Sequence, residues 1–162
     1  MQFYLKQIGI IFLQILVFYC VGFSQTAEEF FKRGKEHQSN REYELAADAF
    51  GAATKLKPDY AEAFFERGRT NQMKTVKYFP NFSPLSVDSP WMKPIFNDFQ
   101  QAIYLSPNTA NYYYHRGLNY YAMRQFPEAI EDYTKAIALA PDQAEGYRMR
   151  FETYFQQGDF DK

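Results

Sequence analysis

Cysteine is almost absent from this 162-residue chain, and the only one, Cys20, lies in an apolar N-terminal stretch. If that stretch is removed, the rest of the chain can form neither a disulfide nor a cysteine-ligated zinc site. Histidine is equally scarce, since His37 and His115 are the only two and lack the spacing of paired metal ligands. The sequence therefore predicts no metal site and no cofactor.

The chain also lacks an excess of either charge, because its formal net charge is -1 and it contains neither a polybasic run nor an acidic tail. Nucleic-acid binding requires clustered Lys and Arg, so the sequence predicts no nucleic-acid partner. Glycine-rich phosphate loops and pairs of a nucleophile with a base are absent as well. These absences predict a chain that is not an enzyme.

Aromatic residues are abundant, with 17 Phe, 14 Tyr and one Trp, and hydrophobic residues make up 46% of the chain. Disordered segments contain few aromatic rings. The composition therefore predicts a folded chain with ample material for a core.

The first 24 residues have the three-part form of a secretory signal peptide. Lys6 precedes an apolar run over residues 8–23, and small residues precede a cleavage site after Ser24. An uncleaved membrane anchor is the alternative, because residues 3–23 approach the roughly 20 apolar residues that span a bilayer. Either interpretation exports residues 27–162. We expect the bacterial periplasm or cell surface, with contact to the membrane only through residues 1–24 if they are retained.

Two segments of the chain repeat one another. Residues 27–60 and 110–143 are both 34 residues long and align without a gap. The matched pairs are Gly34 with Gly117, Ala46 with Ala129, Phe50 with Tyr133, Ala53 with Ala136 and Pro58 with Pro141. On these positions the chain resembles the tetratricopeptide repeat family along most of its length after residue 27.

The resemblance implies an all-α solenoid of antiparallel helix pairs in a right-handed superhelix. We expect repeat 1 at 27–60, repeat 2 at 61–109, repeat 3 at 110–143 and a partial repeat 4 at 144–162. The small residues allow helices to approach closely, and a larger residue there would overpack the contact. Natural arrays end in a polar capping helix, so either the chain is a fragment of a longer array or the first helix of repeat 4 is the cap.

Repeat 2 contains a proline-rich insert at about 73–94, with Pro80, Pro84, Pro90 and Pro94. Because proline interrupts helices, we expect this segment to leave the stack as a loop. Its rings, of which Tyr78, Phe82 and Trp91 are candidates for binding, either meet a partner or cover the gap between helices.

Arginine recurs just before the small position of each repeat, and aspartate recurs in the second helices of repeats 2 and 3. A buried carboxylate needs a partner, which an arginine of the next repeat could supply. We therefore predict the pairs Asp98–Arg116 and Asp132–Arg150. The alternative is an arginine ladder that binds an anionic ligand.

In the family that the chain resembles, the first helices line a concave groove that holds a partner. The positions carried over by register are Phe31, Lys35, Gln38, Phe65, Arg69, Gln72, Asn111, Tyr114, Leu118, Tyr121, Arg148 and Phe155, flanked by Glu28, Glu62, Glu145 and Glu152. Rings flanked by polar groups suit a peptide, although each ring could instead pack against a neighbouring helix. A basic clamp for a peptide's C-terminal carboxylate is not supported, since Phe31 and Lys35 occupy its positions.

The sequence thus predicts an exported, non-enzymatic scaffold or adaptor that binds a partner protein or peptide of unknown identity. The alternative is a recognition or regulatory module of a larger envelope protein or enzyme. Fold alone does not distinguish them.

Overall fold

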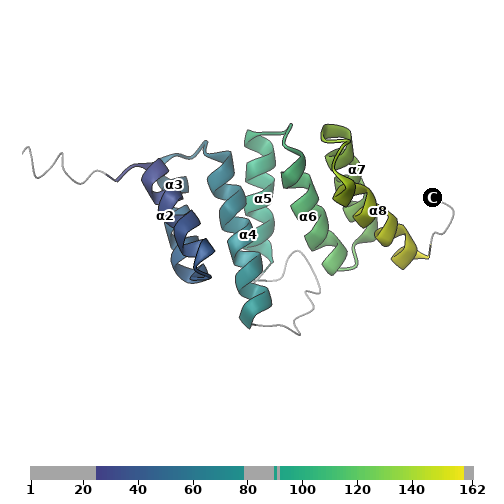
Figure 1. The fold of residues 1–162 in the computed structure, drawn as a ribbon, viewed down its shortest axis with the longest axis horizontal. Coiled ribbons are helices and arrows are strands. Elements are labelled where there is room, and N and C mark those ends of the chain that lie inside the picture. Colours follow the sequence, from purple (N-terminus) through teal and green to yellow (C-terminus); the bar gives the residue numbers. More distant parts are fainter. Residues whose placement is uncertain (1–24, 79–89, 91, 159–162) are drawn as a thin grey trace, which may run out of the picture.

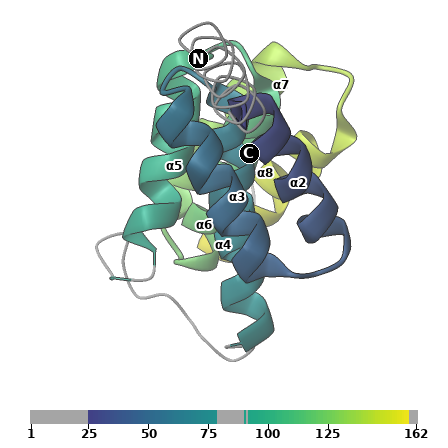
Figure 2. The same cartoon turned by 90° about the vertical axis from the view of Figure 1, so that its left-hand side faces the viewer.

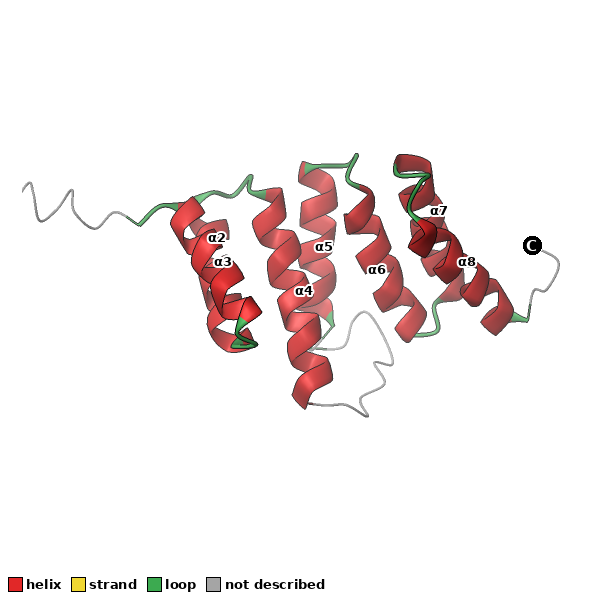
Figure 3. Cartoon of the chain, in the orientation of Figure 1, coloured by secondary structure: helices red, strands yellow, loops and turns green. Residues whose placement is uncertain are grey.

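The structure, a computed structural model, describes residues 25–78, 90 and 92–158 of the chain. These residues form helices and no strand (Figure 3). The helices are α2 (Ala27–Ser39), α3 (Tyr43–Leu56), α4 (Ala61–Tyr78), α5 (Lys93–Leu105), α6 (Ala110–Ala122), α7 (Phe126–Leu139) and α8 (Ala144–Gln157). The all-α prediction is confirmed.

The helices form an elongated row in chain order (Figure 1). Each helix packs mainly against its neighbours in sequence, so α2 contacts α3, α4 contacts α5, α6 contacts α7, and α8 lies on α7. Figure 2 looks along the row from the α2–α3 end. This is the arrangement of a helical repeat array, in which each unit contacts only adjacent units.

Local signals in the sequence start and stop these helices. Thr26 caps α2, because its hydroxyl accepts from the backbone N–H of Glu29 at 3.1 Å while the Glu29 carboxylate accepts from the Thr26 N–H at 3.2 Å. Pro94 and Pro127 stand in the first turns of α5 and α7, where a missing N–H costs nothing.

The small positions hold the helix pairs together. A methyl group added at Gly34 would lie 2.6 Å from the Phe50 ring, and one at Gly117 would lie 2.8 Å from the Tyr133 ring. At Gly68 it would lie 3.1 Å from Cβ of Asp98. The predicted close approach at these glycines is confirmed.

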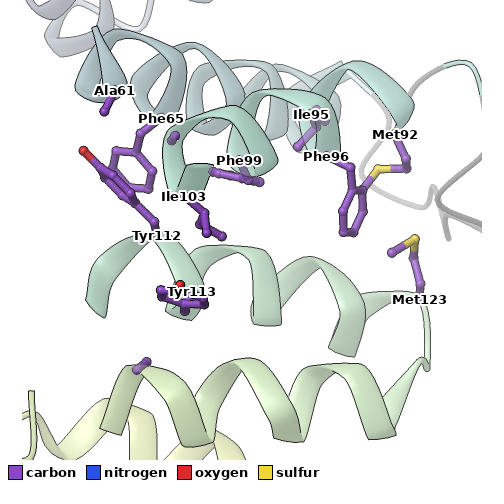
Figure 4. Close-up of a cluster of buried hydrophobic side chains, with 12 residues drawn as sticks. Ala61, Phe65, Met92, Ile95, Phe96, Phe99, Ile103, Tyr112, Tyr113 and Met123 are labelled. Atoms are coloured by element: carbon purple, nitrogen blue, oxygen red, sulfur yellow. The ribbon is translucent and has the colours of Figure 1, made fainter. Parts of the chain in front are cut away.

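The largest group of buried hydrophobic side chains joins α4, α5 and α6 (Figure 4). Phe65 faces Tyr112 with ring centroids 4.7 Å apart, and Phe99, which is fully buried, lies 5.9 Å from Phe65. Met92 and Met123 lie near Phe96 at the other end of the group. Repeats 2 and 3 therefore share one core.

The insert is shorter than the sequence predicted. Helix α4 continues to Tyr78 and α5 begins at Lys93, so residues 73–78 and 93–94 are helical rather than loop. The expectation was wrong there because no proline precedes Pro80 in this segment, and Pro94 is tolerated in a first turn. Phe82, Trp91 and the side chain of Tyr78 lie outside the described residues.

None of the described helices is long and apolar enough to cross a membrane. The predicted signal peptide or anchor at residues 1–24 lies outside the described residues.

Candidate partner-binding surface

A buried carboxylate organises the polar side chains between α2 and α4. Glu66 is 5% exposed and accepts hydrogen bonds from Lys35 Nζ at 2.8 Å, Gln38 Nε2 at 3.0 Å and Arg69 Nε at 3.1 Å. Three of the predicted groove residues therefore converge on one side chain that the sequence analysis did not single out. The sequence could have indicated one of these contacts, because Glu66 and Arg69 are three residues apart on the same helix.

The same network links its members to one another. The Gln38 side-chain oxygen accepts from Arg69 Nη2 at 3.0 Å, and Gln38 Nε2 also donates to the Thr70 hydroxyl at 2.9 Å. Thr70 in turn donates to the backbone oxygen of Glu66 at 2.7 Å. Glu66 thus holds Lys35, Gln38 and Arg69 in fixed positions. Because two basic groups surround one carboxylate, the network has a net positive charge.

His115 of α6 lies next to this network. Its ring packs edge-on against Phe65 at 5.2 Å and against Tyr114 at 5.4 Å, and its Nδ1 is buried without a hydrogen-bond partner among the described residues. Burial lowers the pKa of His115 to about 4, Arg69 acts in the same direction, and Glu66 opposes them. The imidazole is therefore neutral at physiological pH.

An aromatic region continues from α6 to α8. Tyr114, Leu118 and Tyr121 pack against the cluster that contains Tyr133 and Met149. They are half-buried, so each ring or side chain keeps an open side. The Tyr121 hydroxyl donates to Glu152 of α8 at 3.4 Å. We call Lys35, Gln38, Glu66, Arg69, His115, Tyr114, Leu118, Tyr121 and Glu152 together the first-helix surface.

The structure removes one predicted groove residue from this surface. Phe65 is 3% exposed, so its ring belongs to the core and is not available to a partner. Phe31 is half-buried against Phe50 at 5.5 Å and Tyr60 at 5.0 Å, and only part of it is accessible. Residue spacing places both rings on first helices but does not show how much of each ring a neighbouring helix covers, so it could not distinguish a core ring from a surface ring.

The remaining predicted residues are dispersed. Gln72 lines a pocket of about 390 Å³ with Arg41, Tyr43, Met73 and Lys77, at the turn after α2. Asn111, Arg148, Glu62 and Glu145 are exposed, and Phe155 is 53% exposed. Glu28 is exposed and pairs with Lys57 at 2.9 Å.

The predicted arginine pairs are wrong. Arg67 donates from Nε to Asp98 at 2.9 Å, and Arg116 donates from Nε and Nη2 to Asp132 at 2.8 and 2.7 Å. Each arginine therefore pairs with the second helix of its own repeat, not of the preceding one. The reason is the adjacent glycine, which brings that helix so close that the neighbouring arginine meets its aspartate.

A further contact from each of these arginines reaches the preceding repeat. Arg67 Nη1 donates to the Thr54 hydroxyl at 3.0 Å, Arg116 Nη1 to Gln100 at 2.7 Å, and Arg150 Nη1 to the Thr134 hydroxyl at 3.3 Å. Burial raises the pKa of Asp98 and of Asp132, while the arginine hydrogen bonds lower it. These arginines serve the stacking of the array, which argues against the ladder for an anionic ligand.

Within the described ranges, no three histidine, cysteine or carboxylate side chains are grouped to hold a metal ion.

Two family models, both described as tetratricopeptide repeat, match residues 110–143 and 31–71. A search of curated proteins found no match.

Solved structures of similar fold include a crystal structure of MamA, with 26% identity and a TM-score of 0.71 over 83% of this chain and 70% of that one. The first TPR of Spaghetti (RPAP3), bound to the HSP90 peptide SRMEEVD, has 18% identity and a TM-score of 0.69 over 84% of this chain and 96% of that one. A mutant O-GlcNAc transferase of Thermobaculum terrenum has 17% identity and a TM-score of 0.63 over 79% of this chain but 22% of its own.

Proposed function

We propose that this tetratricopeptide repeat protein is a non-enzymatic scaffold or adaptor that holds a protein or peptide partner on its first-helix surface. Tetratricopeptide repeats generally act as interaction modules, and a structural neighbour of this chain is bound to a peptide. Catalysis by this chain has no support in the residues that the described helices bring together.

The observation that carries the proposal is the pre-ordered network around Glu66. A side chain that is fixed before binding loses little conformational entropy when a partner arrives. Lys35, Gln38 and Arg69 are fixed in this way by hydrogen bonds from α2 to α4. Such an ordered polar cluster beside half-buried rings combines orientation with apolar contact area.

The two ends of the surface favour different parts of a partner. Lys35 and Arg69 outnumber Glu66, so the α2–α4 end favours a carboxylate or a backbone carbonyl. Tyr114, Leu118 and Tyr121 at the α6–α8 end favour an apolar or aromatic side chain. We infer a partner segment that carries both an acidic group and a hydrophobic residue.

We also propose that residues 1–24 direct export, so that binding takes place in the periplasm or at the cell surface. The support is the three-part sequence pattern that ends at Ser24. Fusion of residues 1–30 to alkaline phosphatase should give active enzyme outside the cytoplasm. Replacing the apolar run over residues 8–23 with polar residues should abolish that activity, and unchanged activity would contradict the proposal.

A second candidate is a recognition module within a larger protein. It is favoured by the O-GlcNAc transferase, of which the matched region is only 22% of the length. Mass spectrometry of the native protein would distinguish the two. A mass well above that of this chain would support the second candidate.

Selection from a phage-displayed random peptide library tests the binding surface directly. We expect enriched peptides to lose at least about tenfold in affinity, or about 1.4 kcal/mol, when Tyr114 and Tyr121 are both replaced by alanine. Arg69→Gln should weaken the acidic peptides selectively.

Tyr104→Ala is the matched control, because Tyr104 is 76% exposed on the second helix α5. It removes an exposed ring without touching the first-helix surface, so affinity should not change. Peptides that lose affinity with Tyr104→Ala but not with the double variant would place the site elsewhere.

A further inference from the structure

Two residues separate the proposed cleavage site from the first described helix. Gly22 and Ser24 are the small residues before the cut, so cleavage after Ser24 makes Gln25 the first residue of the mature chain. Gln25 and Thr26 are both exposed, and α2 begins at Ala27. The α-amino group that cleavage creates therefore lies at the surface, directly before a helix.

A glutamine in the first position can close a ring on itself. Its α-amine nitrogen attacks the side-chain amide carbon, the N–Cδ bond forms and the Cδ–Nε2 bond breaks. Nε2 leaves as ammonia with one proton from the amine, so the reaction needs no oxidant and no second reactant. Because an α-amino group has an ordinary pKa of about 8, part of it is uncharged and nucleophilic at neutral pH. The product is the five-membered lactam of pyroglutamate.

The start of α2 uses atoms of Thr26 and leaves those of Gln25 available for the ring. The Thr26 hydroxyl accepts from the Glu29 N–H at 3.1 Å, and the Thr26 N–H donates to the Glu29 carboxylate at 3.2 Å. The Thr26 carbonyl oxygen accepts from the Phe30 N–H at 3.1 Å. The lactam consumes only the α-amine and the side-chain amide of Gln25. Ring closure is therefore compatible with all three of these hydrogen bonds.

The lactam also removes a positive charge from the N-terminal end of α2. This end carries the positive part of the helix dipole, so an ammonium group beside it is unfavourable. The first-turn carboxylates offset it little, because Glu28 already accepts from Lys57 at 2.9 Å and Glu29 from the Thr26 N–H. Neutralising the amine at Gln25 therefore relieves an unfavourable charge.

We propose that Gln25, freed by the cleavage that accompanies the proposed export, is a modification site and is converted to pyroglutamate. The lactam has no primary amine, so an aminopeptidase that needs a free N-terminus cannot begin there. Exposed chain ends are preferred sites of proteolysis, and loss of Gln25 and Thr26 would remove the cap of α2. The modification thus preserves the helix that carries Lys35 and Gln38 of the first-helix surface.

Mass spectrometry of the exported protein tests the modification. The full chain would be expressed in an exporting bacterial host and recovered from the periplasm. Its mass should be that of residues 25–162 less one ammonia, and fragmentation should assign the loss to Gln25. Pyroglutamyl aminopeptidase should then expose Thr26. The matched control is Gln25→Asn, which should keep its amine and its full mass because its shorter side chain would need a strained four-membered ring.

Treatment with a general aminopeptidase tests the protective role. The unchanged protein should keep its first residue and its midpoint of thermal unfolding. The Gln25→Asn protein should lose residues 25 and 26, and its midpoint should fall because α2 is no longer capped. Untreated Thr26→Ala protein should show a fall of similar size.

A mature chain that begins at Gln25 with a free amine would overturn the lactam and leave the proposed export intact. A periplasmic chain that retains residues 1–24, or begins at another residue, would also overturn the modification without contradicting export. Loss of export in the alkaline phosphatase fusion would overturn both proposals. A Gln25→Asn protein that resists the aminopeptidase as well as the unchanged protein would overturn the protective role.

Discussion

His115 and Tyr133 have side-chain polar atoms that are buried without a hydrogen-bond partner among the described residues. A buried unpaired polar group costs about 1–3 kcal/mol of stability. At the matching positions of repeats 1 and 2, Tyr133 is replaced by Phe50 and Phe99, which have no hydroxyl. These residues therefore allow the energetic effect of single atoms to be measured.

Tyr133→Phe should raise the free energy of unfolding by about 1 kcal/mol, because the hydroxyl is buried and unpaired while the ring stays on Gly117. Urea titration followed by circular dichroism measures the change. The reverse substitution, Phe99→Tyr, should lower stability at the matching position. A loss of stability on Tyr133→Phe would mean that the hydroxyl has a bonding partner.

His115 should make the protein less stable in mild acid. Its folded pKa of about 4 lies below the ordinary value of 6.5, so the unfolded chain binds its proton first as the pH falls. Stability should therefore be lost between about pH 6.5 and pH 4, by at most about 3 kcal/mol.

The variant His115→Phe should flatten this dependence when urea midpoints are compared across the same pH range. Asp98 and Asp132 act in the opposite sense, since their raised pKa values favour proton uptake by the folded state, but they remain in both proteins. Identical pH profiles for the two proteins would show that His115 does not titrate in this way.

At the scale of the helix, the array depends on close approach at a glycine and on the ion pair next to it. In repeats 2 and 3, the first helix carries arginine then glycine, and the second carries aspartate then an aromatic ring, as in Arg116-Gly117 and Asp132-Tyr133. Because Gly117 has no side chain, the Tyr133 ring can pack directly against it. Asp132, which precedes Tyr133, then lies close enough to accept a hydrogen bond from Arg116. Packing and charge pairing thus specify the same register of two helices.

Gly117→Ala should destabilise the protein by about 1–3 kcal/mol, because the new methyl group would lie 2.8 Å from the Tyr133 ring. Gly51→Ala is the control, since its methyl group meets nothing closer than 3.8 Å. In the middle of α3, that change should stabilise by about 0.5–1 kcal/mol. Thermal unfolding of both variants tests the pair, and equal shifts would contradict the packing argument.

A double-mutant cycle with Arg116→Gln and Asp132→Asn should show a coupling energy of about 1–3 kcal/mol, because both groups are mostly buried. The cycle of Arg116→Gln with Asp98→Asn should show almost none. Chemical denaturation gives both numbers, and the opposite ranking would favour pairing between repeats.

For the whole molecule, stability is distributed unevenly along the row. Repeats 2 and 3 share the largest buried cluster, whereas α8 packs mainly on α7 and exposes Tyr147 and Phe151. A helix that packs mainly on one neighbour opens before helices that pack between two neighbours.

Backbone amides of α8 should consequently exchange with deuterium faster than those of α4, α5 and α6, as measured by mass spectrometry of peptic fragments. Slower exchange in α8 than in α5 would contradict this distribution of stability along the row.

Much of the fold could be predicted from local sequence signals. Gly34, Gly117 and the aligned alanines predicted where helices meet, because a close contact tolerates only small side chains. The insert was less predictable, since proline density locates a loop without giving its ends. The segment from residue 73 was expected to be a loop, whereas in the structure helix α4 continues to Tyr78.

The candidate surface could be predicted only in part. Register placed Lys35, Gln38 and Arg69 on first helices, but not their common partner Glu66. Nor did it separate Phe65, which is buried, from Tyr121, which is half-buried. A side chain's exposure depends on the helices stacked around it, and those lie elsewhere in the sequence.

The sequence by itself determined the all-α repeat class, the glycine contacts and the distribution of charge along the chain, because these follow from residue types at a regular spacing. Only the tertiary structure decided which carboxylate each arginine meets, which rings remain accessible, and that one face of α8 is uncovered among the described residues. Spacing specifies the turn of the helix on which a side chain lies. The distance between helices, which is set by packing, specifies what it touches.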